Sequence, residues 1–483
     1  MGRRMSRHWF APLSIGLALA AFITGPAWWQ GGYVASQGAE VYGHAWVQAW
    51  AADAWPAWPS GTSLAAGAAS WPILDGLPTW LAAGLAQLVG LRAAWNLLIA
   101  AGVVLAAVGG ARLAKAVGGA PIVGAVAVPL MPIWLGSITS GLTEDLAIGL
   151  LALAIAAGLE GRWVRAGILA GVLALCGLYL AWFAGLALVI LGVRALFQSR
   201  DQWRGILGGA LLAGVLASAA AAPFASQLRE PTPARPRAPA AEPLWALNPW
   251  RGADAASFLA VGKVDTVGAV VREHPTYLGY ATIALAVVGG GPAGWAAVAG
   301  CALASVGDDV SVAGKPTGLG NPVASLLHAI PMGDRFRNHA RIMLLGQLVL
   351  VAMAARGATR VARGRRSWVV GAALVIAAEV VLLSPARAPA PVTPAASPAI
   401  YAELSRAPLA LPVRVVGARN PQAPLFDQRA HGRVLRNGPN RPDPGRPRPD
   451  EEIVVAFGEA VARLQGELGP PDTTVGDDAA WWP

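Results

Sequence analysis

The chain has 483 residues, of which 55% are hydrophobic and only 13% charged, with a mean hydropathy of +0.50 and a formal net charge of +10. A soluble protein covers its surface with roughly a quarter charged residues, so this composition excludes a soluble globular protein and indicates an integral membrane protein. The positive charge forms no basic stripe interleaved with aromatic residues, so we expect no nucleic-acid partner.

The first apolar run covers residues 9–29 and follows a basic N-terminus. It is long enough to span and ends at Trp28 and Trp29, which favours an uncleaved first span over a signal peptide. The next run, residues 77–90, is short and predicts an interfacial or re-entrant helix. Ten further runs bring the predicted total to about eleven transmembrane helices. They cover residues 93–113, 119–139, 143–159, 164–180, 182–198, 203–223, 274–292, 293–306, 339–357 and 367–384.

The basic residues between these runs predict an orientation. Arg and Lys concentrate in the loops 112–118, 160–165, 198–204 and 356–366, whereas the Gly-rich loop near 290 is uncharged. Because short cytoplasmic loops carry the excess of Lys and Arg, we expect a cytoplasmic N-terminus and an extracytoplasmic C-terminus. The predicted location is the cytoplasmic (inner) membrane, crossed many times.

This topology predicts an all-α polytopic bundle followed by a small extracytoplasmic α+β region. The expected parts are a transmembrane domain over 1–384 with outer loops 30–90, 224–273 and 307–338, a Pro/Ala-rich linker over 385–398, and a C-terminal region over 399–483. Because that last region is small for an independent core, we expect it to dock on the outer loops.

Polar residues gather first in the outer loop 30–90. Glu40 and His44 are four residues apart and would share one face of a helix, and Asp53 follows. Carboxylates beside aromatic rings suit a sugar, whose hydroxyls need acceptors and whose C–H faces stack on rings. An interfacial aromatic belt with solvated acids is the alternative. The neighbouring aromatic residues are Tyr42, Trp46, Trp50, Trp55 and Trp58.

Glu144 and Asp145 form a second group, at the outer end of the predicted span 143–159. Adjacent acids are costly if they face lipid, so they must face a cavity or cap the helix. Thr143 or Ser140 as a cap, with acids in the first turn, is ordinary helix-start chemistry. Helix capping accounts readily for one of the two acids and less well for the second.

A third group precedes the predicted span 339–357, where Arg335, Arg337 and Arg341 follow one another closely. A guanidinium fork matches the oxygens of a lipid phosphate. Surface anchoring by long Arg side chains is an equal alternative.

Several short motifs are spread over most of the chain. A first span is followed by a long outer loop with an early acid, Glu40. Further motifs are Trp58-Pro-Ser-Gly-Thr62, Ala94-Trp-Asn96, Tyr277-Leu-Gly279, Ile330-Pro331 before the Arg run, and Gln428-Arg-Ala-His-Gly432. Together these motifs resemble the GT-C superfamily of multi-span glycosyltransferases, and more narrowly its bacterial YfhO-like and uncharacterised branches. The chain departs from the best-known members because Glu40 has no adjacent acidic partner.

The resemblance implies an inverting transferase that moves a sugar from a polyprenyl-phosphate carrier to a glycan or lipid acceptor on the outer face. Glu40 would be the general base, assisted by Asp53 or Glu144. The remaining site residues would bind sugar or lipid phosphate, and are His44, Asp145, Arg335, Arg337 and Arg341. No cofactor is certain, and a divalent metal is an open alternative. A non-catalytic protein that binds, scaffolds or moves a lipid-linked glycan is the competing hypothesis.

Overall fold

The structure is a computed structural model, and its description is restricted to part of the chain. The described residues are 7–35, 41–56, 75–222, 253, 255–259, 276–307, 309–312, 315–330 and 339–395. The predicted C-terminal region 399–483 therefore lies outside the described residues, as do Glu40, Arg335 and Arg337.

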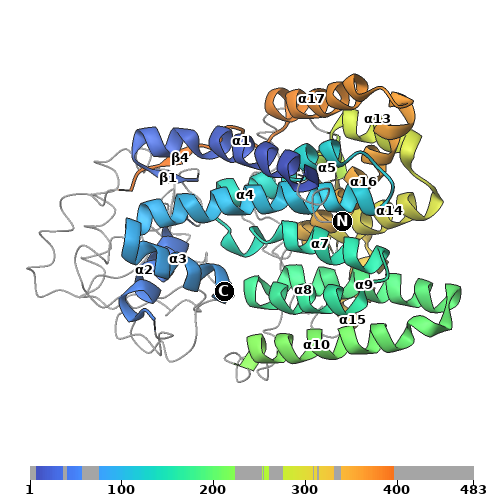
Figure 1. Cartoon of the computed structure of the whole chain (residues 1–483), viewed down its shortest axis with the longest axis horizontal. Coiled ribbons are helices and arrows are strands. Elements are labelled where there is room, and N and C mark those ends of the chain that lie inside the picture. Colours follow the sequence, from blue (N-terminus) through green and yellow to red (C-terminus); the bar gives the residue numbers. More distant parts are fainter. Residues whose placement is uncertain are drawn as a thin grey trace, which may run out of the picture.

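The described residues form a helical bundle whose longer helices run side by side (Figure 1). In chain order its helices are α1 (Arg7–Gln30), α2 (Val41–Ala54), α3 (Gly76–Val89), α4 (Leu91–Ala116), α5 (Pro121–Ala127), α6 (Pro132–Ser140), α7 (Ile148–Leu159), α8 (Trp163–Cys176), α9 (Leu178–Gln198), α10 (Trp203–Ala221), α13 (Tyr280–Gly289), α14 (Pro292–Ser305), α15 (Pro322–Ala329), α16 (Met343–Ala362) and α17 (Arg366–Leu383). Short 3-10 turns include η1 (Thr143–Asp145), η2 (Arg200–Gln202), η4 (Ala255–Phe258) and η6 (His339–Ile342). The strands are β1 (Tyr33–Val34), β2 (Asp309–Val312), β3 (Lys315–Gly320) and β4 (Val392–Thr393), and they form the antiparallel pairs β1–β4 and β2–β3.

The predicted all-α polytopic bundle is confirmed, and a helix occupies each of the predicted apolar runs. Within the described residues, seven segments are long and apolar enough to cross a membrane. The other predicted spans correspond to α7, α8, α13 and α14, which have 10 to 14 residues. At a rise of 1.5 Å per residue such helices are shorter than the roughly 30 Å hydrocarbon core. The interfacial or re-entrant segment predicted at 77–90 is the 14-residue helix α3.

Helices approach one another closely where glycines face each other. A Cβ atom on Gly149 of α7 would lie 2.2 Å from the carbonyl oxygen of Leu105 in α4, and one on Gly357 of α16 would lie 1.9 Å from that of Leu285 in α13. The same arrangement joins α8 to α10, where a Cβ on Gly167 would meet the Gly209 carbonyl oxygen at 2.0 Å. Small residues allow such backbone contact between helices in a membrane.

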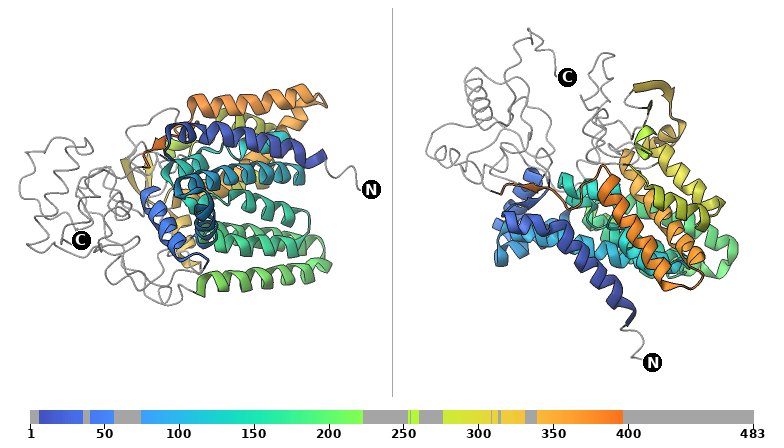
Figure 2. Two further views of the ribbon diagram at one scale, coloured as in Figure 1. Left: turned by 60° about the vertical axis from the view of Figure 1, so that its left-hand side comes forward. Right: turned by 90° about the horizontal axis from the view of Figure 1, so that it is seen from above.

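One end of the bundle is crossed by α2 and α3, and the N-terminus of the chain lies toward the other end (Figure 2). At the α2 end, β1 pairs with β4, so residues just after the last span return to the first outer loop. Asn96 secures β1 by accepting from Val34 N at 3.0 Å and donating to the Gly32 carbonyl at 3.0 Å. The first part of the predicted linker 385–398 is therefore an ordered contact with the first loop.

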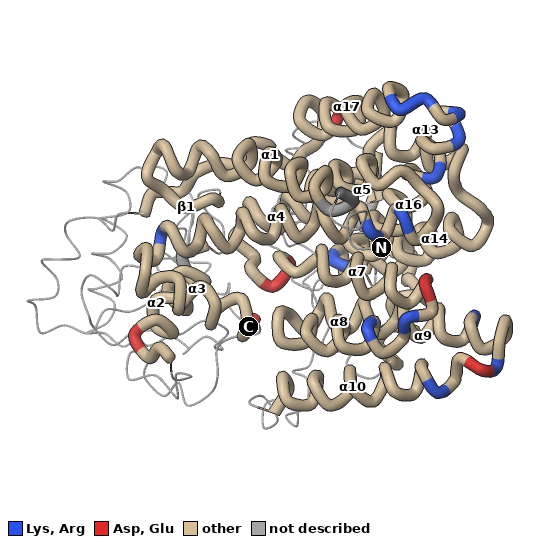
Figure 3. Tube along the Cα trace, in the orientation of Figure 1, with Lys and Arg blue, Asp and Glu red and all other residues tan. Residues whose placement is uncertain are grey.

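Basic residues gather at the opposite end, where α9 is joined to α10 and α16 to α17 (Figure 3). The pattern in space agrees with the positive-inside pattern of the sequence, because the Arg-bearing loops meet at one end of the bundle. We refer to this as the basic end, and to the end bearing α2 and α3 as the α2 end. A cytoplasmic basic end and an outer α2 end remain a prediction.

Substitution of Gly149 tests the close packing of α7 on α4. We expect Gly149→Ala to lower thermal stability in detergent by about 1–3 kcal/mol, since its methyl group would overpack a backbone contact. Gly185→Ala on α9 is the matched control, because a Cβ there has no atom within 4 Å. Equal melting temperatures for the two variants would contradict the packing described.

Candidate functional site

The site is assembled around η1, the turn between α6 and α7. Gly141 ends α6 at φ +81°, a left-handed conformation that favours glycine. A Cβ on Gly141 would also lie 2.7 Å from the backbone of Val41, so this glycine lets the start of α2 approach η1. On the other side, a Cβ on Gly177 would lie 2.7 Å from the Glu144 carbonyl oxygen, so the break between α8 and α9 also accommodates η1.

Arg341 of η6 is the charged centre of the site. Its Nη1 donates to Glu144 Oε1 at 2.5 Å, and its Nε lies 3.9 Å from Asp145 Oδ2. The guanidinium carbon is 4.7 Å from the centre of the Tyr179 ring, which places the cation over an aromatic face. Arg341, Glu144 and Asp145 are all buried, so the guanidinium holds two carboxylates away from bulk water.

Asp145 is held by α6 as well as by Arg341. Ser137 Oγ donates to Asp145 Oδ2 at 2.7 Å, and Trp134 Nε1 donates to the Asp145 carbonyl oxygen at 2.8 Å. The other carboxylate oxygen, Oδ1, is buried and accepts no hydrogen bond from the described residues. This oxygen is an acceptor whose hydrogen-bonding capacity is unused within the described structure.

His44 of α2 lies between Glu144 and a third carboxylate, Asp75. Its Nε2 is 3.9 Å from Glu144 Oε2 and its Nδ1 is 3.9 Å from Asp75 Oδ2. The Thr143 hydroxyl lies 3.0 Å from His44 Nδ1 and donates to Asp75 Oδ2. His44 is the more exposed member of this pair, with 17% of its side chain accessible against 3% for Asp75.

Asp75 is the N-cap residue of α3, but its side chain does not cap that helix. Burial raises the pKa of its carboxyl group from 3.8 to about 6, an effect opposed by His44 and reinforced by Glu144. Asp75 lies in the loop before α3, outside the membrane-crossing segments. A carboxylate with this pKa exchanges protons near neutral pH, which is the range suited to a general base.

Three carboxylates thus face one guanidinium and one imidazole. A cluster with this excess of acceptors suits hydroxyl groups or developing positive charge better than a free anion. Within the described residues, no group of three or more His, Cys, Asp and Glu is arranged to hold a metal ion. We define the cluster by His44, Asp75, Glu144, Asp145 and Arg341.

The structure brings together four of the residues singled out from the sequence. Glu144, Asp145, His44 and Arg341 belong to the cluster. Asp53 is exposed near the end of α2 and is not part of it. The alternative role of Thr143 as a helix cap is not observed, since its side chain contacts His44 and Asp75.

Asp75 lies in the predicted outer loop 30–90, but the sequence does not single it out as a site residue. Its setting, Asp75-Gly-Leu-Pro78, is typical of a helix start, and that reading explains the acid without a site. The contact with Thr143 spans 68 positions of sequence and has no local signature.

Comparisons with known proteins give a distant structural likeness. No family model and no curated protein matches the sequence. The fold is similar to a crystal structure of the oligosaccharyltransferase of Archaeoglobus fulgidus in its apo form, with a TM-score of 0.46 and 12% sequence identity. The likeness covers 89% of this chain and 64% of that one. A likeness this distant assigns by itself neither a family nor an activity to the chain.

The pairing of Arg341 with Glu144 is testable by a double-mutant cycle. We expect Arg341→Met to destabilise the protein by about 3–5 kcal/mol, because it leaves buried carboxylates uncompensated. Adding Glu144→Gln should recover part of that loss, giving a coupling of about 0.5–3 kcal/mol in thermal or denaturant unfolding. The control is Arg366→Met at the exposed start of α17. Strictly additive effects of the two cluster substitutions would contradict the pairing.

The raised pKa of Asp75 predicts a pH-dependent difference in stability. Well below pH 3.8 Asp75 is protonated in both folded and unfolded chains, and its burial then costs nothing extra. As the pH rises from about 4 to about 6, Asp75 ionises in the unfolded chain before it ionises in the folded one, so wild type loses stability relative to Asp75→Asn, by about 3 kcal/mol at most, and the loss levels off above about pH 6. Melting curves in detergent from pH 4 to 8 measure the difference. A gap that stays constant or narrows as pH rises would contradict the assignment.

Proposed function

We propose that the protein is a membrane glycosyltransferase that moves a sugar from a polyprenyl-phosphate carrier to a hydroxyl group at the α2 end of the bundle. The observation that carries the proposal is the buried cluster of three carboxylates, one of which has its pKa raised to about 6. Buried acids in a membrane protein are costly and mark functional sites. The cluster lies at the end of the bundle away from the Arg-rich loops, which is the face expected to be outside.

The chemistry requires one base and one leaving group. A carboxylate accepts the proton of the acceptor hydroxyl, whose oxygen attacks the anomeric carbon of the sugar. The bond between that carbon and the phosphate oxygen breaks, and the carrier phosphate leaves with the electron pair. Because phosphate is already a good leaving group, one base suffices, in contrast to glycoside hydrolysis, which uses a pair of carboxylic acids.

Two carboxylates are candidates for this base. Asp75 has the appropriate pKa, and its carboxylate accepts a hydrogen bond from the Thr143 hydroxyl that helps to fix its orientation. Glu40 is the candidate from sequence and precedes the described start of α2 by one residue. Oδ1 of Asp145, which is buried and accepts no hydrogen bond from the described residues, is available to a sugar hydroxyl.

The positive charge of Arg341 is shared by Glu144 and Asp145, so its first role in this proposal is to hold the acids in place. In this proposal the carrier phosphate binds Arg335 and Arg337, which precede η6 by four and two residues. The narrower likeness to the YfhO-like branches stays a prediction.

A transfer assay with a synthetic polyprenyl-phosphate hexose tests the proposal and distinguishes the two bases. If Asp75 is the base, Asp75→Asn should lower transfer by about two to four orders of magnitude, the usual range for a general base. If Glu40 is the base, Glu40→Gln should do so instead. Asp201→Asn, an exposed acid at the basic end, is the control and should retain normal transfer. Normal transfer by both Asp75→Asn and Glu40→Gln would contradict either carboxylate as the base. If wild type transfers sugar from no donor, the alternative is favoured, a protein that binds or moves a lipid-linked glycan.

A further inference from the structure

A groove at the basic end is lined by residues that do not belong to the cluster. It has a volume of about 620 Å³ and is lined mainly by α8, together with the turn before it and Gly205 of α10. This volume falls within the range of small-molecule binding sites, roughly 300–1,000 Å³. The proposed transfer chemistry uses no residue of the groove.

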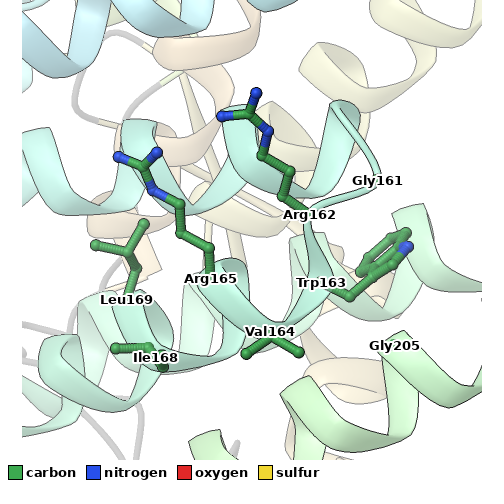
Figure 4. Close-up of a pocket in the computed structure, with 8 residues that line it drawn as sticks. All are labelled: Gly161, Arg162, Trp163, Val164, Arg165, Ile168, Leu169 and Gly205. Carbon is green, nitrogen blue, oxygen red and sulfur yellow. The ribbon is translucent and has the colours of Figure 1, made fainter.

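The groove combines two arginines with apolar side chains. Figure 4 shows Arg162 and Arg165 extending to the same side of α8, with Leu169 beside Arg165. Val164 and Ile168 also line it and are 47% and 43% exposed. Exposed apolar residues next to paired guanidinium groups are the two components needed to bind a molecule with an anionic head and an apolar tail.

The positive charge of the groove is only partly neutralised. Glu160 Oε2 lies 2.5 Å from Arg112 Nη2 and 3.5 Å from Arg162 Nε, so two guanidinium groups share one carboxylate. Arg165 forms no ion pair with any residue in the described part of the chain. Three arginines against one acid leave a net positive charge, which is complementary to a phosphate group.

The outer wall of the groove continues onto an exposed apolar surface of α10. Only 6% of the most apolar window of the α10 segment is buried within the protein. The α10 helix packs on α8 through Gly167 and Gly209, and it presents Leu207 and Leu211 outward, 49% and 61% exposed. An acyl chain leaving the groove along α8 and α10 would therefore remain in the hydrocarbon region.

We propose that this groove binds an anionic phospholipid from the leaflet at the basic end, with its phosphate on Arg162 and Arg165 and an acyl chain along Val164 and Ile168. Charge complementarity favours an anionic over a zwitterionic lipid, and the apolar wall favours a lipid over a free anion. The site is separate from the donor carrier of the proposed transfer reaction, which would bind at the α2 end. Its failure would leave the proposed function unaffected.

The test is native mass spectrometry of the purified full-length protein, titrated with phosphatidylglycerol or phosphatidylcholine. We expect tighter binding of phosphatidylglycerol, and a loss of roughly tenfold or more in its affinity in the double variant Arg162→Gln/Arg165→Gln, since this variant removes the charge-assisted hydrogen bonds to the lipid phosphate. The matched control is Arg365→Gln/Arg366→Gln, which removes the same charge at the same end outside the groove. Its affinity should change less than about twofold, because these exposed arginines do not line the groove and their charge is screened by salt.

A second variant removes space and keeps charge. Ile168→Trp should fill part of the groove and weaken phosphatidylglycerol binding while both arginines remain. Equal binding of the two lipids, equal loss in the groove and control variants, or unchanged binding by Ile168→Trp would each overturn the proposal. Displacement of the lipid by excess inorganic phosphate would also overturn it, because the groove would then be a site for a free anion.

Discussion

The ion pair between Glu144 and Arg341 is the contact on which the rest of the site depends. It joins η1 to η6 across 197 positions of sequence, and both partners are buried. An unpaired charge in that place would cost several kcal/mol, so η1 and η6 must come together before either can be buried. Two glycines bring other elements close to η1. A side chain at Gly141 would collide with Val41 at the start of α2, and one at Gly177 would collide with Glu144.

Much of the bundle could be predicted from sequence because lipid imposes a simple rule. An apolar run that cannot expose its backbone to hydrocarbon must form a helix, and each predicted run contains one. The lengths were less predictable. Pro129 and Pro132 interrupt the predicted span 119–139, which consists of α5 and α6, and glycines end α8 and precede α13.

The acids Glu144 and Asp145 could be found in sequence because adjacent carboxylates beside an apolar run need an explanation. Their partners could not. The sequence predicts that Arg341 binds lipid phosphate, as one of three neighbouring arginines. Nothing in the local sequence indicates that its Nη1 lies 2.5 Å from Glu144 Oε1. Asp75 has a helix-start sequence, and only the tertiary contact with Thr143 shows that its side chain serves a different purpose. Most arginines of the described residues gather at the basic end (Figure 3), whereas the buried acids of the cluster are neutralised in part by Arg341.

The central claim is that His44, Asp75, Glu144, Asp145 and Arg341 form the site that receives the sugar of a lipid-linked donor. Its most direct test is a cryo-EM structure of the full-length protein in nanodiscs with a synthetic polyprenyl-phosphate hexose. The account predicts sugar density beside His44 and Asp75, with the Glu144–Arg341 pair intact. Density for the donor only in the groove at Arg162 and Arg165, or a map in which Arg341 lies apart from Glu144, would contradict it.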